Sequence, residues 1–459
     1  MKKRMLSQVL IGLEALTGVA FGSVLVTTAA AQTAKAPAQV VKPPVAQAWI
    51  DVSTFTGMGM PGMGGVGAGV GAGMGIGSGA NPMAMLGSLF GGGQSAKNVF
   101  GMTQTGSAGR WVDVTLSTSR NPALSEALHA VPSGMSLAPS LKLVAPKAAK
   151  GPPPTLGDDG VIEPEFERPK GKMFLYWGCG DTIRAGQPRV LDMAAANAGD
   201  FQKFFVSRRA TQRGAHSAIG RPVWPNEVDA RMLPGSASLA GEHAFTGQGV
   251  PENFKFAVPP AQDLMPAIQL NQTEARGATQ LEWAGLPTAR AYFVAAMGAK
   301  GGSSGTGGSE AEMVFWTSSE LPEVGMGLLD YQTNSAVDRW LKEKVLLEPA
   351  VTRCTVPKGI FAAEGGAMLR LIAYGSELNL AYPPRPTDSR LAWEPEFAVK
   401  LRVKSVANAV LGLDMGMNTS IESQQRSAAG TDPATTPTDK KDEMKKLDPV
   451  GILRGILGR

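Results

Sequence analysis

Hydrophobic and polar residues alternate most regularly near the C-terminal end of the chain, in residues 396–405. The apolar positions are Phe397, Val399, Leu401 and Val403, and the positions between them include Lys400, Arg402 and Lys404. Because successive side chains of a strand point to opposite faces, this pattern predicts a strand that is buried on one face. Residues 110–119 alternate in the same way and predict a second half-buried strand.

Other patterns predict further strands and two helices. Residues 171–180 form an apolar and aromatic run between glycines, which is typical of a strand buried on both faces. Residues 335–346 place apolar side chains at helical spacing, and Ser335 with Asp338 resembles a capping box at the start of that helix. Residues 121–130 predict a short helix. The C-terminal half holds several more short β-rich segments with turn residues between them, which favours a β-sandwich.

Two short motifs in that half resemble a known family. Trp283 and Tyr292, in "LEWAGLPTARAYFV", resemble the B–C strand pair of a fibronectin type III-like sandwich, and "MLRLIAYGSE" at 368–377 is similar to strand F of that family. The resemblance covers roughly residues 263–405, and the helix near Trp340 departs from it. It implies a binding or spacer module rather than a catalytic domain.

These patterns predict a mainly β protein. We expect a fibronectin- or Ig-like β-sandwich, a second β-rich region before it, and disordered low-complexity N- and C-terminal segments. The expected order is a signal peptide at 1–31, a Gly/Met-rich tether at 32–105, a β-rich region with a Pro-rich linker at 106–262, the sandwich at 263–412 and a disordered charged tail at 413–459. The apolar residues that end the tail suggest docking on a partner or on a membrane surface if they form a helix, whereas Gly451, Gly455 and Gly458 favour a frayed tail instead.

The N-terminal residues predict export. Lys2, Lys3 and Arg4 precede an apolar stretch at 15–26, and three alanines at 29–31 offer a cleavage site. We therefore expect a location in the periplasm, or an extracellular or outer-membrane-associated one. Cleavage would lower the formal net charge from +5 to +3. The basic pI therefore gives no reason to expect nucleic acid as a partner.

Residues 56–79, "TGMGMPGMGGVGAGVGAGMGIGSG", contain no charge and place glycine at every second position from Gly65 onward. A period of two makes no helical face, and glycine loses more backbone entropy on ordering than other residues, so a flexible tether is the first interpretation. Met58, Met60 and Met63 support a second one. Their thioethers suit Cu(I), and copper is the only cofactor that the sequence suggests.

The two cysteines, Cys179 and Cys354, suit an oxidising compartment, where they would pair in a disulfide. The alternative is two unpaired thiols buried in strands. A single sequence does not decide between a bond and two thiols.

A basic concentration lies between residues 203 and 221. It includes four arginines that a phosphate-bearing or other anionic glycan would match, namely Arg208, Arg209, Arg213 and Arg221. The alternative is a solvated basic face without a ligand.

Motifs for catalysis are weak. A G-x-S-x-G match at 301–305 lies in a Gly/Ser-rich stretch without a following helix, and the three histidines have no ligand spacing to one another. We therefore expect an exported cell-envelope protein with a structural or binding role and no enzymatic activity, whose partners are other envelope proteins or an anionic glycan. The alternatives are a periplasmic copper-handling protein and an envelope hydrolase whose acidic residues converge only in the fold.

Overall fold

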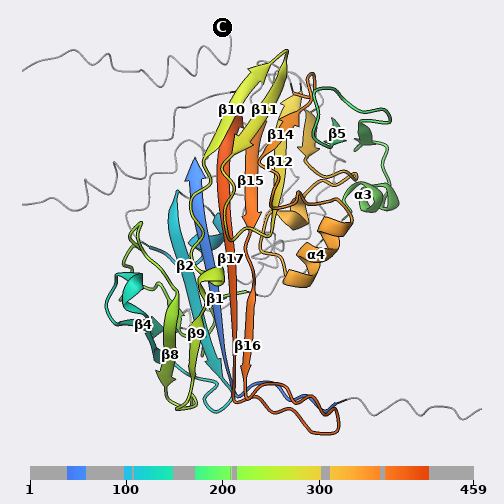
Figure 1. Cartoon of the computed structure of the whole chain (residues 1–459). Helices are drawn as coiled ribbons and strands as arrows, with labels where there is room; N and C mark the ends of the chain where they lie inside the picture. The colour runs from blue at the N-terminus through green and yellow to red at the C-terminus, as the bar shows by residue number, and fades with distance from the viewer. Residues whose placement is uncertain are drawn as a thin grey trace, which may run out of the picture.

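The computed structural model describes most of the chain between residues 39 and 412 (Figure 1). The described ranges are 39–57, 98–105, 108–147, 171–206, 208, 214–300, 311–361 and 367–412. The expected signal peptide, the Gly-rich part of the expected tether and the expected charged tail lie outside them.

The described residues are mainly β and form one large sheet of 14 strands. The strands are β1 (Ala46–Gly57), β2 (Gly109–Thr118), β3 (Glu126–Ala130), β4 (Ser140–Val144), β5 (Gly171–Trp177), β6 (Arg189–Asp192), β7 (Val223–Trp224), β8 (Gly241–Gly247), β9 (Lys255–Val258), β12 (Ala291–Lys300), β13 (Ala311–Thr317), β15 (Ala367–Tyr374), β16 (Leu378–Tyr382) and β17 (Phe397–Leu411). Their order is β6-β5-β13-β12-β15-β17-β1-β2-β7-β4-β3-β8-β9, and β16 pairs with β17 beside that path.

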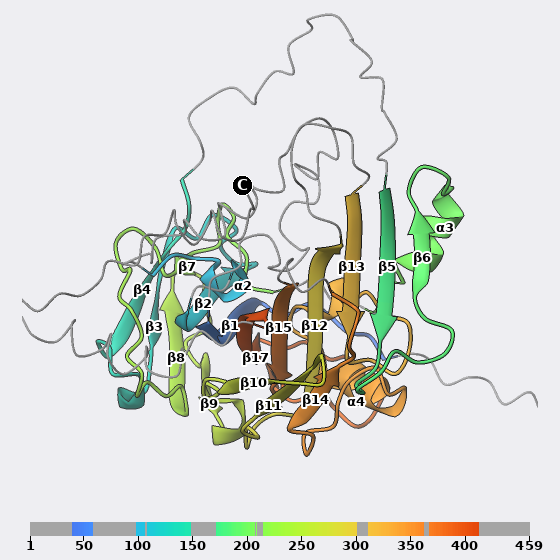
Figure 2. The same cartoon turned by 90° about the horizontal axis from the view of Figure 1, so that it is seen from above.

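A second sheet of three strands packs on the large one. It has the order β10-β11-β14 and consists of β10 (Leu270–Ala275), β11 (Ala278–Trp283) and β14 (Arg353–Val356). Figure 2 shows it lying across β12, β15 and β17. Leu281 and Trp283 of the small sheet share one buried cluster with Tyr292, Leu371 and Leu401 of the large sheet.

That cluster also continues into the N-terminal half of the chain. It includes Val114 of β2, Leu141 of β4 and Phe245 of β8. The ring of Phe254, just before β9, stacks on Phe397 at the start of β17, with 4.3 Å between their centroids. The end of the sheet thus folds back onto its middle, and the expected boundary between residues 262 and 263 does not divide the core.

The centre of the large sheet is the pair β1–β17. All 12 residues of β1 pair with β17 in parallel, and β2 pairs with the other edge of β1 in the antiparallel sense. The prediction of a tether at 32–105 is therefore wrong for Ala46–Gly57. The reason is that Ile50 and Val52 point into the main core while Asp51 and Ser53, on the opposite face, are buried as well.

Two further predictions need correction for related reasons. The strand predicted at 110–119 is β2, but it is buried on both faces, because Asp113 and Thr115 of its polar face are also covered. The helix predicted at 121–130 is absent, since its second half forms β3. There, alternate residues are buried, as a strand with one face on the core requires.

Helical segments are short. They are α2 (Met102–Thr105), α3 (Ala198–Phe204), α4 (Asn334–Lys342) and the 3-10 turns η1 (Ser133–Met135), η2 (Pro260–Gln262) and η3 (Met326–Leu328). Helix α4 packs Val337 and Trp340 against Phe293 of β12, on the face of the large sheet opposite the small one. It begins after Thr333, whose hydroxyl accepts a hydrogen bond from Ala336 N, so Thr333 and not Ser335 is the cap.

A disulfide joins the two sheets. It links Cys179, which follows β5, the second strand from one edge of the large sheet, to Cys354 in β14 of the small sheet. The two residues are 175 positions apart in the sequence, so the bond closes a long loop of the chain.

Candidate functional site

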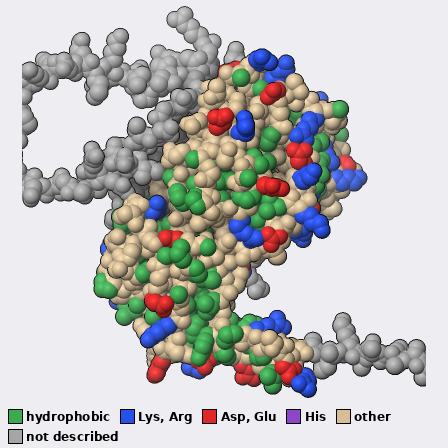
Figure 3. Space-filling view, in the orientation of Figure 1, with side chains coloured by type: hydrophobic (Ala, Val, Ile, Leu, Met, Phe, Trp, Pro, Cys, Tyr) green, Lys and Arg blue, Asp and Glu red, His purple; other side chains and the backbone are tan. Residues whose placement is uncertain are grey.

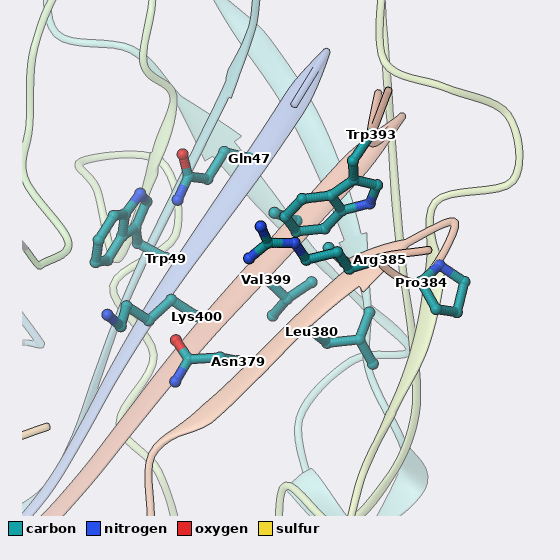
Figure 4. A pocket seen from close by; sticks show the side chains of 11 residues that line it. Gln47, Trp49, Asn379, Leu380, Pro384, Arg385, Trp393, Val399 and Lys400 are labelled. Carbon is teal, nitrogen blue, oxygen red and sulfur yellow. The ribbon is translucent and has the colours of Figure 1, made fainter. Parts of the chain in front are cut away.

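An open groove of about 870 Å³ lies over the start of β1, β17 and β16. Its floor follows from the strand register, which places Gln47 beside Ala398, Trp49 beside Lys400, and Asn379 beside Lys400 on one face. The segment between β16 and β17 forms the wall, with Arg385 and Trp393 (Figure 4). The volume is in the range of small-molecule sites, about 300–1,000 Å³.

Lys400 is held in place on the floor of the groove by two contacts. Its ammonium lies 5.4 Å from the ring centroid of Trp49 and 3.1 Å from Oε1 of Glu377. The side chain of Glu377 is 3% exposed, and its Oε1 also accepts a hydrogen bond from Asn379 Nδ2. The positive charge of Lys400 is therefore compensated from below, while Trp49 is itself mostly covered.

Trp393 forms part of the wall, and its side chain is half-buried. Its indole Nε1 donates to the carbonyl oxygen of Pro383 over 3.0 Å, and its backbone N donates to Val40 O over 2.8 Å. Lys42 N in turn donates to Trp393 O over 2.9 Å. The ring is thus fixed in position and its only donor is used, so what it offers to a ligand is an apolar face.

The guanidinium of Arg385 lies over that ring, with its carbon 5.6 Å from the centroid of Trp393. Its Nε donates to Oε1 of Gln39 over 2.7 Å. Within the part of the chain that the structure describes, neither terminal nitrogen of Arg385 has a protein partner. The guanidinium is therefore oriented by its stem and its Nε, and its terminal fork faces solvent.

The protruding segment around the groove carries charges of both signs. Figure 3 shows them gathered at the bottom of the view, where residues 383–396 lie. Lys42 pairs with Glu394 over 2.6 Å, and Arg390 pairs with Asp388 over 2.7 Å. These ion pairs are exposed, and they leave Arg385 as the cation without a carboxylate partner in the described lining.

Beyond the groove, the same face of β1 and β17 carries a buried ion pair between Arg402 and Asp51. Arg402 donates through Nε and Nη2 to the two oxygens of Asp51, over 2.7 and 2.6 Å. Burial disfavours the charged guanidinium, but the adjacent Asp51 outweighs it, so the pKa of Arg402 is raised. A Cβ at Gly214 would lie 1.8 Å from Arg402 Nη2, so only glycine lets the chain pass over the pair.

Asp113 of β2 lies directly opposite Asp51 and is also buried. Burial raises the pKa of Asp113 to about 7, although hydrogen bonds from the Thr103 hydroxyl and Gly101 N act in the opposite direction. This pKa lies in the range of a general acid, but the carboxyl group is closed off from solvent. We therefore assign Asp113 and the Asp51–Arg402 pair to the structure of the sheet and not to a reaction site.

A histidine pair is buried in the N-terminal half. His129 Nε2 and His243 Nδ1 are 3.0 Å apart, and His243 Nε2 lies 2.7 Å from the carbonyl oxygen of Leu239. Since a carbonyl only accepts, His243 carries its proton on Nε2 and accepts from His129. Burial lowers the pKa of His129 well below its usual 6.5, and His243 lowers it further. Their sequence spacing gave no sign of this contact.

The candidate anion site of the sequence is only partly described. Arg208 forms ion pairs with Glu323, which is buried, and with Glu343 over 3.8 Å. Nη1 of Arg221 lies 2.7 Å from Nε2 of His216. Each of these two arginines is thus engaged with another protein group, and Arg209 and Arg213 lie outside the described residues.

The candidate copper ligands Met58, Met60 and Met63 also lie outside the described residues. Among the residues that are described, no group of three or more His, Cys, Asp and Glu side chains is arranged to hold a metal ion. None of the described helices is long and apolar enough to cross a membrane.

Sequence reasoning missed the groove residues Trp49, Arg385 and Trp393. The one signal was the polar face of residues 396–405, which includes Lys400. No known protein-family profile matches the chain, and no curated protein has a matching sequence.

Proposed function

We propose that this chain is an exported, non-catalytic binding protein of a bacterial cell envelope, and that the groove is its binding site. The groove itself is the observation that carries the proposal. It combines an open hollow over the central strands β1 and β17 with a hydrogen-bonded tryptophan and an oriented guanidinium on the loop between β16 and β17. Recognition sites usually place a few polar groups among apolar ones in this way.

The lining favours binding over catalysis. It contains aromatic, aliphatic, amide and cationic side chains, and the described lining includes no carboxylate, imidazole, hydroxyl or thiol group. Hydrolysis of a glycan or peptide needs a group that accepts a proton or attacks as a nucleophile near neutral pH. Arg385 and Lys400 serve better as ligands for negative charge.

A fibronectin-like sandwich is part of the same proposal. If β11 and β12 are strands B and C, B lies beside β14 in the small sheet, and C lies beside β15, the assigned strand F, in the large sheet. Immunoglobulin-type sandwiches divide these strands in this manner, with B and E in one sheet and C, F and G in the other. The strand order supports the assignment, with β17 as strand G.

Two features support export, namely the N-terminal residues and the disulfide. The basic and apolar residues of 2–26 have the pattern of a signal peptide, and a disulfide between Cys179 and Cys354 suits an oxidising compartment. Expression of the full chain in a Gram-negative host tests this part. We expect the periplasmic fraction to contain protein that begins near Gln32; full-length protein with Met1 in the cytoplasm would contradict it.

Binding is tested by sedimentation of the purified mature protein with washed Gram-negative envelope fragments. We expect the unchanged protein to sediment and the double variant Trp393→Ala/Arg385→Met to remain in solution. Arg339→Met is the matched control, because Arg339 also lies over a tryptophan, at 5.3 Å from the ring of Trp340, but outside the groove. Sedimentation that the groove variant does not reduce would rule out the groove as the binding site.

A further inference from the structure

We propose that the ligand of the groove is an acidic polysaccharide, with a sugar ring on the face of Trp393 and a carboxylate of the sugar chain on Arg385. This inference rests on the proposed function and names the ligand class of the same site. It places an anionic glycan in the groove rather than on the arginines of residues 208–221.

The first support is the hydrogen bonding of Trp393, which orients its ring in the wall of the groove. Its indole N–H is used by Pro383 O, and the backbone on both sides is tied to residues 40 and 42. The half-buried ring has no donor left, so it binds a ligand through the part of its face that Arg385 does not cover, and such an apolar face attracts the C–H-lined face of a sugar ring. Because its hydrogen bond already orients the ring, little side-chain entropy is lost on binding.

The second support is the balance of charge. Lys400 is compensated by Glu377 at 3.1 Å, whereas the terminal nitrogens of Arg385 face the groove without a partner in the described chain. A guanidinium fork matches a carboxylate with two parallel hydrogen bonds. One uncompensated cation beside one aromatic face thus fits a ring that carries one carboxylate, as in a uronic acid.

The third support is the pair of amides on the floor. Asn379 gives its Nδ2 to Glu377 and keeps its Oδ1 as an acceptor, and Gln47 has no hydrogen-bonded partner among the described residues. Together they offer acceptors and a donor at neighbouring positions of adjacent strands. Sugar hydroxyls both donate and accept, so they match this set.

An extended peptide fits the groove less well. Peptides that add to a sheet bind through backbone groups of an open strand edge. The floor strands β1 and β17 have neighbours on both sides, β2 and β17 for the first, and β1 with β15 and β16 for the second. The third floor strand, β16, pairs only with β17 among the described strands, and its five residues offer one short edge for a peptide. The lining side chains come from all three strands and from the wall, so recognition by side chains fits the whole groove better than addition of a strand at that edge. A proline-rich peptide, which docks on aromatic rings, is the remaining rival.

The test is calorimetric titration of the mature protein with four probes. They are a hexamer of galacturonic acid, neutral maltohexaose, a hexaglutamate peptide and a hexaproline peptide. We expect the galacturonate hexamer to bind at least about tenfold more tightly than maltohexaose, and neither peptide to bind in a way that depends on the groove. Binding should weaken as salt is raised, because a charge pair contributes to it.

Variants locate the binding. Arg385→Met keeps the stem but removes the charge, so it should lower the affinity for the galacturonate hexamer at least about tenfold, to the level of maltohexaose. Trp393→Ala should weaken both sugars. Arg339→Met should change neither, and thermal unfolding should confirm that all three variants are folded.

Three results would overturn the inference: no binding of the galacturonate hexamer, equal binding by the Arg385 variant, or tighter groove-dependent binding of either peptide. Failure here is separate from failure of the proposed function. If groove variants abolish sedimentation with envelope fragments but the galacturonate hexamer does not bind, the groove remains the binding site and its ligand is of another class.

Discussion

Replacement of Arg402 by methionine would leave the carboxylate of Asp51 buried without its counter-charge. In the folded protein the two side chains are 3% and 1% exposed and share two hydrogen bonds. The other described hydrogen bond to Asp51 comes from Ala215 N, over 3.0 Å. Arg402 also lies 4.3 Å from the ring of Tyr331, a contact that methionine keeps only as packing.

We expect Arg402→Met to lower the free energy of unfolding by about 3–5 kcal/mol, the usual cost of breaking a buried ion pair from one side. This is a large part of the roughly 5–15 kcal/mol that holds a typical protein folded. Asp51→Leu should cost a similar amount, because it leaves the guanidinium unpaired. The double variant Asp51→Leu/Arg402→Met should cost far less than the sum of the two, since no buried charge remains.

Urea unfolding followed by tryptophan fluorescence at pH 7.5 measures these values. Lys42→Met is the control, because Lys42 and Glu394 form an ion pair that is more than half exposed on both sides. We expect a change of about 0–1 kcal/mol there. Additive costs in the double variant, or a cost for Arg402→Met no larger than that of the control, would refute the reasoning.

Three other predictions follow from buried groups. Because the folded-state pKa of His129 is depressed, its neutral form stabilises the fold above about pH 6.5. We therefore expect the stability of the unchanged protein relative to the His129→Leu variant, measured by urea titration, to fall by about 2 kcal/mol between pH 8 and 5. The folded-state pKa of Asp113 is raised from 3.8 to about 7, so ionisation of this carboxyl group opposes folding increasingly as the pH rises between those values. Between pH 5 and 8, the stability of Asp113→Asn relative to the unchanged protein should therefore rise by about 3 kcal/mol. A difference between the two proteins that does not change with pH would contradict this. Replacement of Cys179 and Cys354 by serine should lower the stability by about 2–5 kcal/mol, and peptide mapping without reductant should find the two cysteines linked in the unchanged protein.

The mainly β character of the chain was predictable, because period-two alternation and short apolar runs are local. Residues 396–405 show both the success and its limit. Phe397 and Val403 face the core as the pattern predicts, but Arg402 and Lys404 are buried too, and sequence polarity alone gave no sign of it. Burial of that face depends on Asp51 and Asp330, which lie in distant segments and neutralise the two cations.

The same limit explains the missed strand β1. Its polar positions Asp51 and Ser53 gave no reason to expect burial, and the glycine-rich residues after it made the whole region look like a tether. The groove was not predictable for a related reason. Trp49, Arg385 and Trp393 come from a strand and a loop far apart in the sequence, and only the register between β1, β17 and β16 brings them together.

The parallel pairing of β1 with β17 has a consequence for the order of synthesis. Asp51 and Arg402 are 351 residues apart, so the ribosome makes β1 long before its partner strand. Until then β1 lacks the neighbour that every one of its residues pairs with, and β15 also lacks β17. Pairing between strands so far apart in the sequence forms more slowly than a hairpin of neighbouring strands. This late pairing agrees with the export that we propose, because a chain that crosses a membrane through a channel must do so before its central strands have paired.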